Sequence, residues 1–347
     1  MIRKLHFLVP GDIGTPTGGY GYDRKLADGL RDLGWTVEIV SLPGSYPDTD
    51  RETRRAADEV FAGLPDGALV MVDGLAFARL PHLAAKAAKR LRLAALVHHP
   101  LTDEGGLTVE KAARFAVDER QALCHAAAVI CTSETTGHRL VEHFGVAASL
   151  MHVAPPGTNR KSLLTQKRNP TLLLCVASIV RRKGHDVLVD ALAQVAALEW
   201  SARFVGPSRD NEWKARLDTR ILERGLADRI TFTGPLNELD AEYARAGIFV
   251  LATRHEGYGM AYAEALAAGL PVVGCAVGAV PEVVPADAGA LVPADDPQAF
   301  ADALRRLLTD RNAYDKAAEA ARHAAERLPR WSDTAVIVAH ALTEIGR

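Results

Sequence analysis

Residues 248–275 contain the pattern that most limits how this chain can fold. Two short, continuous apolar runs, at 248–252 and 271–275, flank a glycine-rich turn and an alanine-rich segment at 261–268. Apolar runs of this length are typical of strands that are buried on both faces of a parallel sheet. The segment therefore predicts a strand, a turn, a helix and a second parallel strand, which is the repeating unit of an α/β fold.

The same alternation extends over both halves of the chain. Strands are expected at residues 4–9, 36–42, 68–72, 94–98 and 127–131, and again at 171–176, 202–205, 230–233, 248–252, 271–275 and 289–292. The alternation stops at Pro155, Pro156 and Gly157, and the polar residues 159–169 are typical of a linker. We therefore expect an α/β protein with two doubly wound, Rossmann-like domains that face each other across a cleft.

Composition excludes several classes of protein. The chain has 347 residues, and 48% of them are hydrophobic. Its net charge is −2, whereas a nucleic-acid-binding protein typically has a strongly basic surface. We expect no signal peptide and no membrane-spanning helix, because no apolar run approaches the required length. The four cysteines form no Cys-x-x-Cys pair and are expected as free thiols in the cytoplasm. The basic runs at 51–55 and 86–92 leave peripheral contact with the inner face of a membrane as an alternative to solvated helix faces.

Two glutamates, Glu256 and Glu264, flank the glycine turn. A turn of this kind presents backbone N–H groups and a helix N-terminus to an anion, most often a phosphate. At about 100° per residue, the two glutamates lie about 80° from a common helix face. If the helix begins near Gly259, Glu256 lies in the turn and Glu264 in the helix. Both could then bind different parts of one ligand that carries phosphate and hydroxyl groups, although a solvated surface pair is the alternative.

Two further turns have residues that suit phosphate. Arg182 and Lys183 precede Gly184 at a strand-to-helix turn, where a bidentate guanidinium and an ammonium suit a diphosphate; a solvated basic loop is the alternative. Gly19 lies in a glycine-rich turn after the first strand, where the lack of a side chain permits a phosphate to approach the backbone closely. A flexible loop is the alternative. Arg24 stands where a dinucleotide fingerprint needs its third glycine, so NAD is disfavoured.

His98 and His99 lie at the end of the expected strand 94–98, on the edge where an α/β sheet binds its ligands. A histidine there could bind a sugar hydroxyl or contact an acceptor, and a core or capping histidine is the alternative. No His-Glu-x-x-His motif occurs, and we expect no metal site.

The combination of these motifs resembles glycosyltransferase family 4, a family of retaining enzymes with the GT-B fold. The resemblance extends over nearly the whole chain and is densest at residues 234–284. There the segment from Glu256 to Glu264 is similar to the family's Glu-x7-Glu signature, and residues 267–273 and 278–282 are similar to the segment that follows it.

The resemblance implies roles for individual residues. Glu264 would bind the ribose hydroxyls of a nucleotide, and Glu256 would bind the donor sugar near its reacting carbon. Arg182 and Lys183 would hold the diphosphate as it leaves, and His98, or else His99, would lie near the donor sugar. The other residues expected at the donor are Gly19, Ser178, Gly257, Tyr258, Gly259 and Met260, and those expected toward the acceptor are His99, Asp103 and Glu104.

One departure from the family pattern affects the diphosphate site. Many relatives carry an arginine five residues before the lysine, at the position of Ser178, and Arg182 is the candidate that replaces it. The resemblance also implies an acceptor-side domain at residues 1–155, with a C-terminal helix at 331–347 packing back on it. A nucleotide-sugar-binding domain would follow at residues 160–328.

The implied reaction is transfer of a hexose from a UDP-type or GDP-type nucleotide sugar to an acceptor hydroxyl, with retained configuration and without a metal or further cofactor. The acceptor would be a glycan, a lipid-linked molecule or a small molecule. Two alternatives remain: a nucleotide-sugar epimerase on a similar fold, and a non-catalytic partner that binds a sugar nucleotide.

Overall fold

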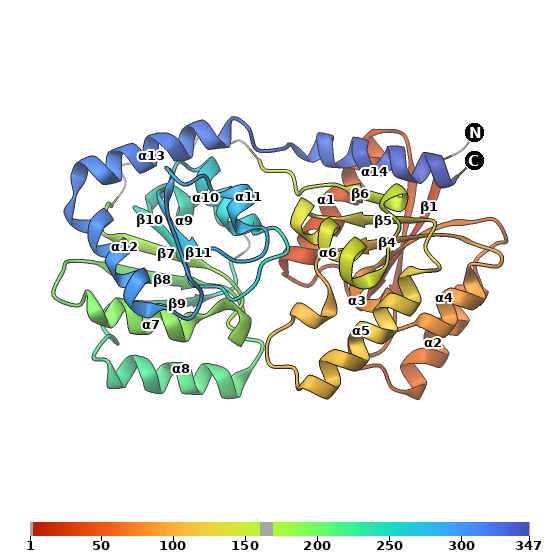
Figure 1. Ribbon diagram of the computed structural model, residues 1–347, viewed down its shortest axis with the longest axis horizontal. Helices are drawn as coiled ribbons and strands as arrows, with labels where there is room; N and C mark the ends of the chain where they lie inside the picture. The colour runs from red at the N-terminus through yellow and green to blue at the C-terminus, as the bar shows by residue number, and fades with distance from the viewer. Residues whose placement is uncertain (1–2, 160–168, 237, 347) are drawn as a thin grey trace. The chain divides into compact units, whose positions relative to one another are not determined.

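The computed structural model describes residues 3–159, 169–236 and 238–346, so most of the expected linker at 159–169 lies outside the described residues. The chain divides into two compact units (Figure 1). Unit 1 comprises Met1–Gly157 and Pro329–Arg347, and unit 2 comprises Thr158–Leu328. Each unit contains one parallel six-stranded sheet, which confirms the expected α/β fold class.

The sheet of unit 1 has the strand order β2-β1-β3-β4-β5-β6. The strands are β1 (Lys4–Pro10), β2 (Thr36–Leu42), β3 (Leu69–Asp73), β4 (Arg92–Val97), β5 (Ala128–Cys131) and β6 (Met151–Val153). The helices are α1 (Gly18–Asp32), α2 (Arg51–Ala62), α3 (Gly74–Phe77), α4 (Pro81–Ala87), α5 (Val109–Leu123), α6 (Glu134–Phe144) and α14 (Trp331–Ile345). Helices α1 and α14 pack together on one face of the sheet, and α2, α4 and α5 cover the other (Figure 1).

The sheet of unit 2 has the strand order β12-β11-β10-β7-β8-β9. Its strands are β7 (Leu172–Val176), β8 (Ser201–Val205), β9 (Ile230–Gly234), β10 (Ile248–Leu251), β11 (Val272–Cys275) and β12 (Gly289–Val292). Its helices are α7 (His185–Gln194), α8 (Asn211–Glu223), α9 (Asp240–Arg245), α10 (Met260–Ala267), α11 (Val280–Val283), α12 (Pro297–Thr309) and α13 (Arg311–Ala325). Helices α7 and α8 lie on one face of the sheet, and α9 and α10 on the other (Figure 1).

Every expected strand is present within two residues of its expected bounds. Strands β3, β5, β10 and β11 are buried along their whole length, which explains why each forms a continuous apolar run. Three short elements of the described chain were not predicted, namely β6, α3 and α11. Strand β6 is half-buried at the sheet edge and therefore has no apolar run, and α3 is a single turn.

The glycine-rich turn after β1 differs from the expectation. Gly19 was expected in a turn ahead of the helix, but residues 18–21 form the first turn of α1. Helix α1 begins at Gly18 because the Thr17 hydroxyl accepts a hydrogen bond from the backbone N–H of Tyr20 at 3.0 Å. This N-cap compensates for the low helix propensity of the glycines, and it fixes Gly19 on the helix.

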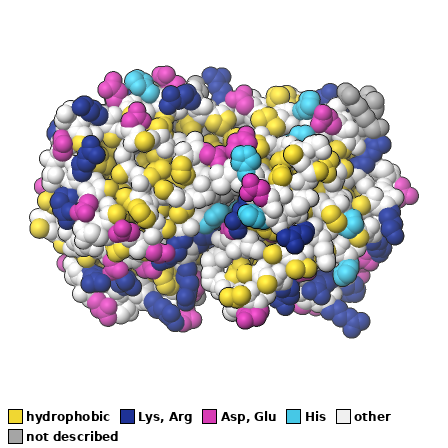
Figure 2. Space-filling view, viewed as in Figure 1, with side chains coloured by type: hydrophobic (Ala, Val, Ile, Leu, Met, Phe, Trp, Pro, Cys, Tyr) yellow, Lys and Arg dark blue, Asp and Glu magenta, His cyan; other side chains and the backbone are white. Residues whose placement is uncertain are grey.

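The charged side chains and the four cysteines are distributed as the near-neutral net charge and the lack of a Cys-x-x-Cys pair lead one to expect. Basic and acidic side chains are interspersed over the visible surface of each unit (Figure 2). Cys131, Cys175 and Cys275 are buried, Cys124 is exposed, and all four are free. None of the helices in the described part of the chain has both the length and the apolarity of a transmembrane segment.

Candidate active site

The order of the strands brings two of the expected turns together in unit 2. Strands β7 and β10 are neighbours, and the chain leaves β7 toward one face of the sheet and β10 toward the other. Such a reversal is the point at which open α/β sheets bind ligands, beyond the carboxyl ends of the strands. The turn with Arg182 and Lys183 follows β7, and the turn with Glu256 follows β10. Two motifs about 70 residues apart in the sequence thus share one edge of the sheet.

Glu256 and Lys183 form a buried ion pair at this edge. The Nζ atom of Lys183 lies 2.6 Å from Oε1 of Glu256, and Nη1 of Arg182 lies 3.9 Å from Oε2. Their side chains are only 8 to 17% exposed. Burial by itself raises the pKa of Glu256, but the charges of Lys183 and Arg182 outweigh it and hold the pKa below its ordinary value. Glu256 is therefore ionised near neutral pH and accepts hydrogen bonds.

Arginine side chains fix the backbone of both turns. The Nη1 of Arg182 donates to the carbonyl of His255 at 2.9 Å, and the backbone N–H of Arg254 donates to the carbonyl of Arg182 at 2.8 Å. The guanidinium of Arg254 also binds both carboxylate oxygens of Asp186 in α7. These contacts join the turn after β7 to the turn after β10, so the position of Glu256 depends on both.

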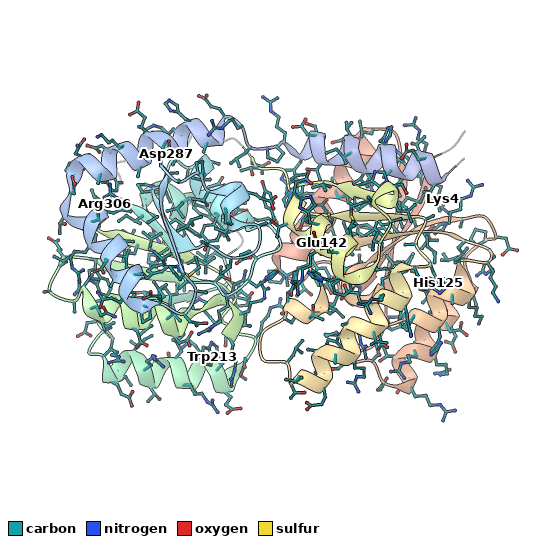
Figure 3. All side chains as sticks on the ribbon, viewed as in Figure 1. Lys4, His125, Glu142, Trp213, Asp287 and Arg306 are labelled. Atoms are coloured by element: carbon teal, nitrogen blue, oxygen red, sulfur yellow. The ribbon has the colours of Figure 1, made fainter. Side chains whose placement is uncertain are left out.

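Arg181 and Ser178 precede Arg182 in the same loop, and their contacts are mainly structural. The Arg181 guanidinium lies 5.1 Å above the ring of Trp213, which lies in the first turn of α8 and is labelled in Figure 3. Ser178 lies in the loop after β7, where its carbonyl accepts a hydrogen bond from the N–H of Val180 at 3.0 Å. Arg182, at 3.9 Å, therefore adds positive charge near Glu256 beside that of Lys183.

The glycine turn ends at the N-terminus of α10. Gly257, Tyr258 and Gly259 are buried, and Met260 is half-buried as the first residue of the helix. Gly259 has a φ of 98° and provides no side-chain cap, so the N–H groups of Met260 and Ala261 have no partner within the helix. The helix thus begins beside Glu256, as the sequence predicted, and it presents unpaired donors where an anion can bind.

Gly278 supports the Glu256 backbone from the segment after β11. Its φ is +50°, and a Cβ built on it would lie 2.2 Å from the carbonyl oxygen of Glu256. The adjacent Ala279 donates its N–H to that carbonyl at 3.0 Å. The close backbone approach therefore requires glycine at position 278.

Glu264 lies in α10, away from the Glu256 pair. The hydroxyl of Tyr243 in α9 donates to Oε2 of Glu264 at 2.8 Å. Burial raises the pKa of Glu264, and the hydrogen bond from Tyr243 offsets part of the rise. The two glutamates are thus in different surroundings: Glu256 has two cationic neighbours, whereas Glu264 has a phenolic hydroxyl. Tyr243 was not predicted, because its position beside Glu264 depends on the packing of α9 against α10.

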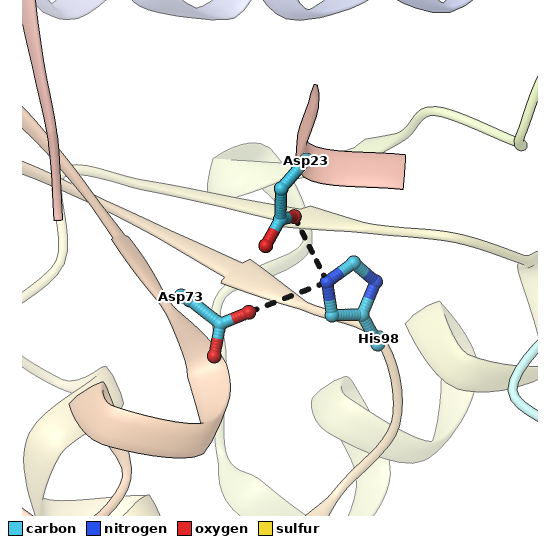
Figure 4. A group of neighbouring side chains, drawn as sticks. All are labelled: Asp23, Asp73 and His98. Carbon is cyan, nitrogen blue, oxygen red and sulfur yellow. Dashed lines mark hydrogen bonds and ion pairs between the residues drawn. The ribbon is translucent and has the colours of Figure 1, made fainter. Parts of the chain in front are cut away.

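In unit 1, His98 lies with two aspartates at the carboxyl edge of the sheet (Figure 4). Its Nε2 is 3.1 Å from Oδ1 of Asp23 in α1 and 3.4 Å from Oδ2 of Asp73 at the end of β3. A Cβ built on Gly19 would lie 3.4 Å from Cδ2 of His98, so Gly19 packs directly against the ring. The three side chains offer ligand atoms within 4.8 Å of one another, a spacing that a cation could use. Neither aspartate was predicted, although Asp73 is the last residue of the buried strand β3.

The remaining acceptor-side candidates lie in the loop after β4, and each has a partner within unit 1. Nε2 of His99 is 2.8 Å from Oε1 of Glu104, and Asp103 binds Arg139 of α6 at 2.6 Å. Beneath this loop, the buried Glu119 accepts a hydrogen bond from the N–H of Leu101. Burial raises the pKa of Glu119 to about 8.

The expected residues therefore fall into two groups, one in each unit. Unit 2 holds Glu256, Arg182 and Lys183 together, with the N-terminus of α10 beside them and Glu264 further along that helix. Unit 1 holds Gly19 against His98, with His99, Asp103 and Glu104 in the following loop. The assignment of these residues to donor and acceptor stays a prediction.

Comparisons with known proteins place these features in a family. A GDP-mannose-dependent alpha-(1-6)-phosphatidylinositol monomannoside mannosyltransferase from Mycobacterium tuberculosis is 34% identical over 211 residues, which are 53% of this chain and 53% of that protein. The chain spans about half the length of the curated relatives it matches.

Solved structures match over almost the full length. A sucrose-phosphate synthase from Thermosynechococcus elongatus has a TM-score of 0.83 at 22% identity and covers 99% of each chain. Anabaena HepE in complex with UDP and glucose has a TM-score of 0.76 at 18% identity, with 97% of this chain and 99% of that chain covered. At these identities the likeness shows the fold, which is the expected GT-B fold.

Two family models match adjoining segments. A model described as "Glycosyltransferase Family 4" matches residues 68–162, and one described as "Glycosyl transferases group 1" matches residues 158–324. Together they extend over residues 68–324 and confirm the resemblance seen in the sequence. The chain belongs to glycosyltransferase family 4.

Proposed function

We propose that the protein transfers a hexose from a nucleotide diphosphate sugar to an acceptor hydroxyl, with retention of the anomeric configuration. The observation that carries this proposal is the buried cluster of Glu256, Lys183 and Arg182 beside the N-terminus of α10. It combines an ionised carboxylate, which accepts hydrogen bonds from sugar hydroxyls, with cations and N–H groups that suit a diphosphate.

The charges of this cluster suit the departure of a diphosphate. As the bond between the anomeric carbon and the phosphate oxygen breaks, negative charge develops on the diphosphate. An ammonium has three donors, so Lys183 can retain its bond to Glu256 and still donate to a phosphate oxygen. Arg182 contributes a second cation, and preorganised charge of this kind is a large source of catalysis.

The proton balance needs no additional base. The acceptor oxygen bonds to the anomeric carbon, and its proton passes to the departing phosphate oxygen. Glu256 is a poor proton donor, because Lys183 and Arg182 hold its pKa low. We therefore assign Glu256 to binding the donor sugar and Glu264 to binding the ribose.

Two named proteins support the choice of substrates. The mycobacterial relative is named as GDP-mannose-dependent with a phosphatidylinositol monomannoside acceptor, and HepE was solved with UDP and glucose. We extend the proposal to a UDP-hexose or GDP-hexose donor in unit 2 and to an acceptor at unit 1, near His99, Asp103 and Glu104. The enzyme would act in the cytoplasm, and at the inner face of the membrane if its acceptor is a lipid.

Calorimetry with a Glu264→Gln variant tests the nucleotide assignment. We expect the variant to bind its nucleoside diphosphate about 10- to 100-fold more weakly, because a charge-assisted hydrogen bond to the ribose contributes about 1.5–3 kcal/mol. The matched control is Glu223→Gln, which changes an exposed glutamate of α8 and should leave affinity unchanged. Equal affinity of wild type and Glu264→Gln would remove Glu264 from the site. Failure of the wild type to bind any UDP or GDP compound would contradict the proposed function.

A further inference from the structure

Asp23, Asp73 and His98 form a cluster that the proposed reaction does not explain. Three separate elements supply it: helix α1, the end of strand β3 and the residue that follows strand β4. The side chains of Asp23 and Asp73 are 0% and 3% exposed, whereas that of His98 is 20% exposed. Both carboxylates contact the same ring nitrogen, Nε2, and Nδ1 lies on the other side of the ring (Figure 4).

The two carboxylates have too few hydrogen-bond donors to compensate their negative charge without a cation. Oδ1 of Asp73 accepts a hydrogen bond from the N–H of Leu75 at 2.8 Å, which caps α3. Oδ2 of Asp23 is buried and has no hydrogen-bond partner among the described residues, and it projects toward Asp73 (Figure 4). A neutral imidazole would leave two buried carboxylates beside one uncharged donor, which is costly in a region of low dielectric. The arrangement therefore favours the imidazolium form of His98.

The opposing effects of burial and of neighbouring charge on the pKa of His98 also favour the imidazolium. Burial by itself lowers the pKa of His98, but its contacts with Asp23 and Asp73 outweigh that effect and raise the pKa above its ordinary value. Burial raises the pKa of Asp23, and the charge of His98 offsets part of that rise. The remaining titratable group against the ring is Tyr22, whose hydroxyl donates to the carbonyl of Ala154 at 2.9 Å and whose pKa burial raises well above its ordinary value.

The orientation of the ring is fixed from several sides. The edge of the His98 ring meets Tyr22 with centroids 5.2 Å apart, and Gly19 packs against the Cδ2 side. The hydroxyl of Thr132, after β5, donates to the carbonyl of His98 at 3.0 Å and holds the backbone. Among the described residues, no side chain or carbonyl accepts a hydrogen bond from Nδ1. The nitrogen that faces away from the carboxylates is thus available to a ligand.

We propose that Asp23 and Asp73 are positioning residues that hold His98 as an imidazolium by its Nε2, so that Nδ1–H is a fixed, charged donor to an oxygen of the substrate. The cluster keeps this donor charged in the pH range where an ordinary histidine, with a pKa of about 6.5, is neutral. Only the identification of the oxygen rests on the proposed function, because the protonation and orientation of His98 belong to the chain itself.

Long-range ¹H–¹⁵N NMR of histidine-labelled protein tests the proposal without any turnover. A His98→Gln variant assigns the signals. At pH 8 we expect His98 to show the two equivalent nitrogen shifts of an imidazolium, while the exposed histidines are neutral. Asp73→Asn and Asp23→Asn should each lower the pKa of His98 by about 1–3 units, the usual effect of one adjacent charge. Asp66→Asn, which alters an exposed aspartate of unit 1, should leave it unchanged.

Each outcome decides the proposal. Neutral nitrogen shifts for every histidine of the wild type at pH 8 would overturn it, and this result needs neither an assignment nor a folded variant. An unchanged His98 pKa in both folded asparagine variants would overturn it as well. A Zn²⁺-dependent shift of Nε2 that is reversed by a chelator would identify a metal site instead. A shift of the Nδ1–H signal with nucleotide sugar, but not with nucleoside diphosphate, would assign the oxygen to the sugar, and a shift with both would assign it to phosphate.

The pH profile of transfer provides a second readout. As the pH rises through the pKa of His98, the charged donor is lost and kcat/KM falls. In Asp73→Asn this fall should begin about 1–3 pH units lower than in the wild type. A profile with the same alkaline limb in both proteins would contradict the positioning role, whereas absence of transfer in every protein would contradict the proposed function and leave the NMR result valid.

Discussion

Glu256→Gln is expected to lower kcat/KM for sugar transfer about 100- to 1,000-fold, the usual effect of removing one preorganised electrostatic contact from an active site. Glutamine keeps the volume of the side chain and still offers an oxygen to Nζ of Lys183, which lies 2.6 Å from Oε1 in the wild type. The fold should therefore persist, with a thermal midpoint below that of the wild type because Lys183 and Arg182 lose their counter-charge. Steady-state kinetics and thermal unfolding check the two expectations separately.

The same variant distinguishes sugar binding from diphosphate binding. Removing the negative charge of Glu256 leaves Lys183 and Arg182 without their carboxylate, so affinity for nucleoside diphosphate should stay equal or increase. Glu223→Gln in α8 is the control for the chemical change and should match the wild type in both assays. Undiminished transfer by folded Glu256→Gln would remove Glu256 from the reaction.

Gly278→Ala is expected to reduce transfer at least as strongly, and to destabilise unit 2. A Cβ at this position would lie 2.2 Å from the carbonyl oxygen of Glu256, which is backbone and cannot rotate away. The left-handed φ of +50° adds about 1–2 kcal/mol of strain for any residue with a Cβ. We therefore expect a thermal midpoint several degrees lower and a loss of transfer of at least about 100-fold through displacement of Glu256.

Gly225→Ala is the matched control for Gly278→Ala. Gly225 has a similar φ of +67°, but a Cβ built there meets no atom within 4 Å. Only the backbone strain should appear, as a modest fall in the thermal midpoint with transfer unchanged. Equal behaviour of the two variants in both assays would show that the close approach of Gly278 to Glu256 does not matter.

The sequence predicted the strands well because the physical signal is local. Strands such as β10 and β11 are buried on both faces, so each forms a continuous apolar run. The start of α10 near Gly259 could also be predicted, since the glycine turn and the alanine-rich run adjoin. The start of α1 at Gly18 was not predicted, because the Thr17 cap outweighs the low helix propensity of the glycines that follow.

The site was harder to predict because its contacts depend on the order of the strands. The pairing of Lys183 with Glu256 requires β7 beside β10, and no local pattern specifies which strands are neighbours. Asp23 is a further case: it lies in a helix, and only the packing of α1 against the sheet buries it beside His98. Residue type and spacing were therefore enough to propose the glutamates and the basic turn as candidates, whereas packing was needed to find the aspartates and Tyr243 beside them.

The most direct test of the central claim is NMR of a nucleotide sugar incubated with the protein and a panel of hydroxyl acceptors, including phosphoinositide lipids. The account predicts release of nucleoside diphosphate together with a new glycoside in which the sugar keeps its anomeric configuration. Inversion at the anomeric carbon would contradict the retaining reaction. Epimerisation of the donor without an acceptor would identify an epimerase, and donor binding without turnover on any acceptor would favour a non-catalytic partner, so either result would contradict the account.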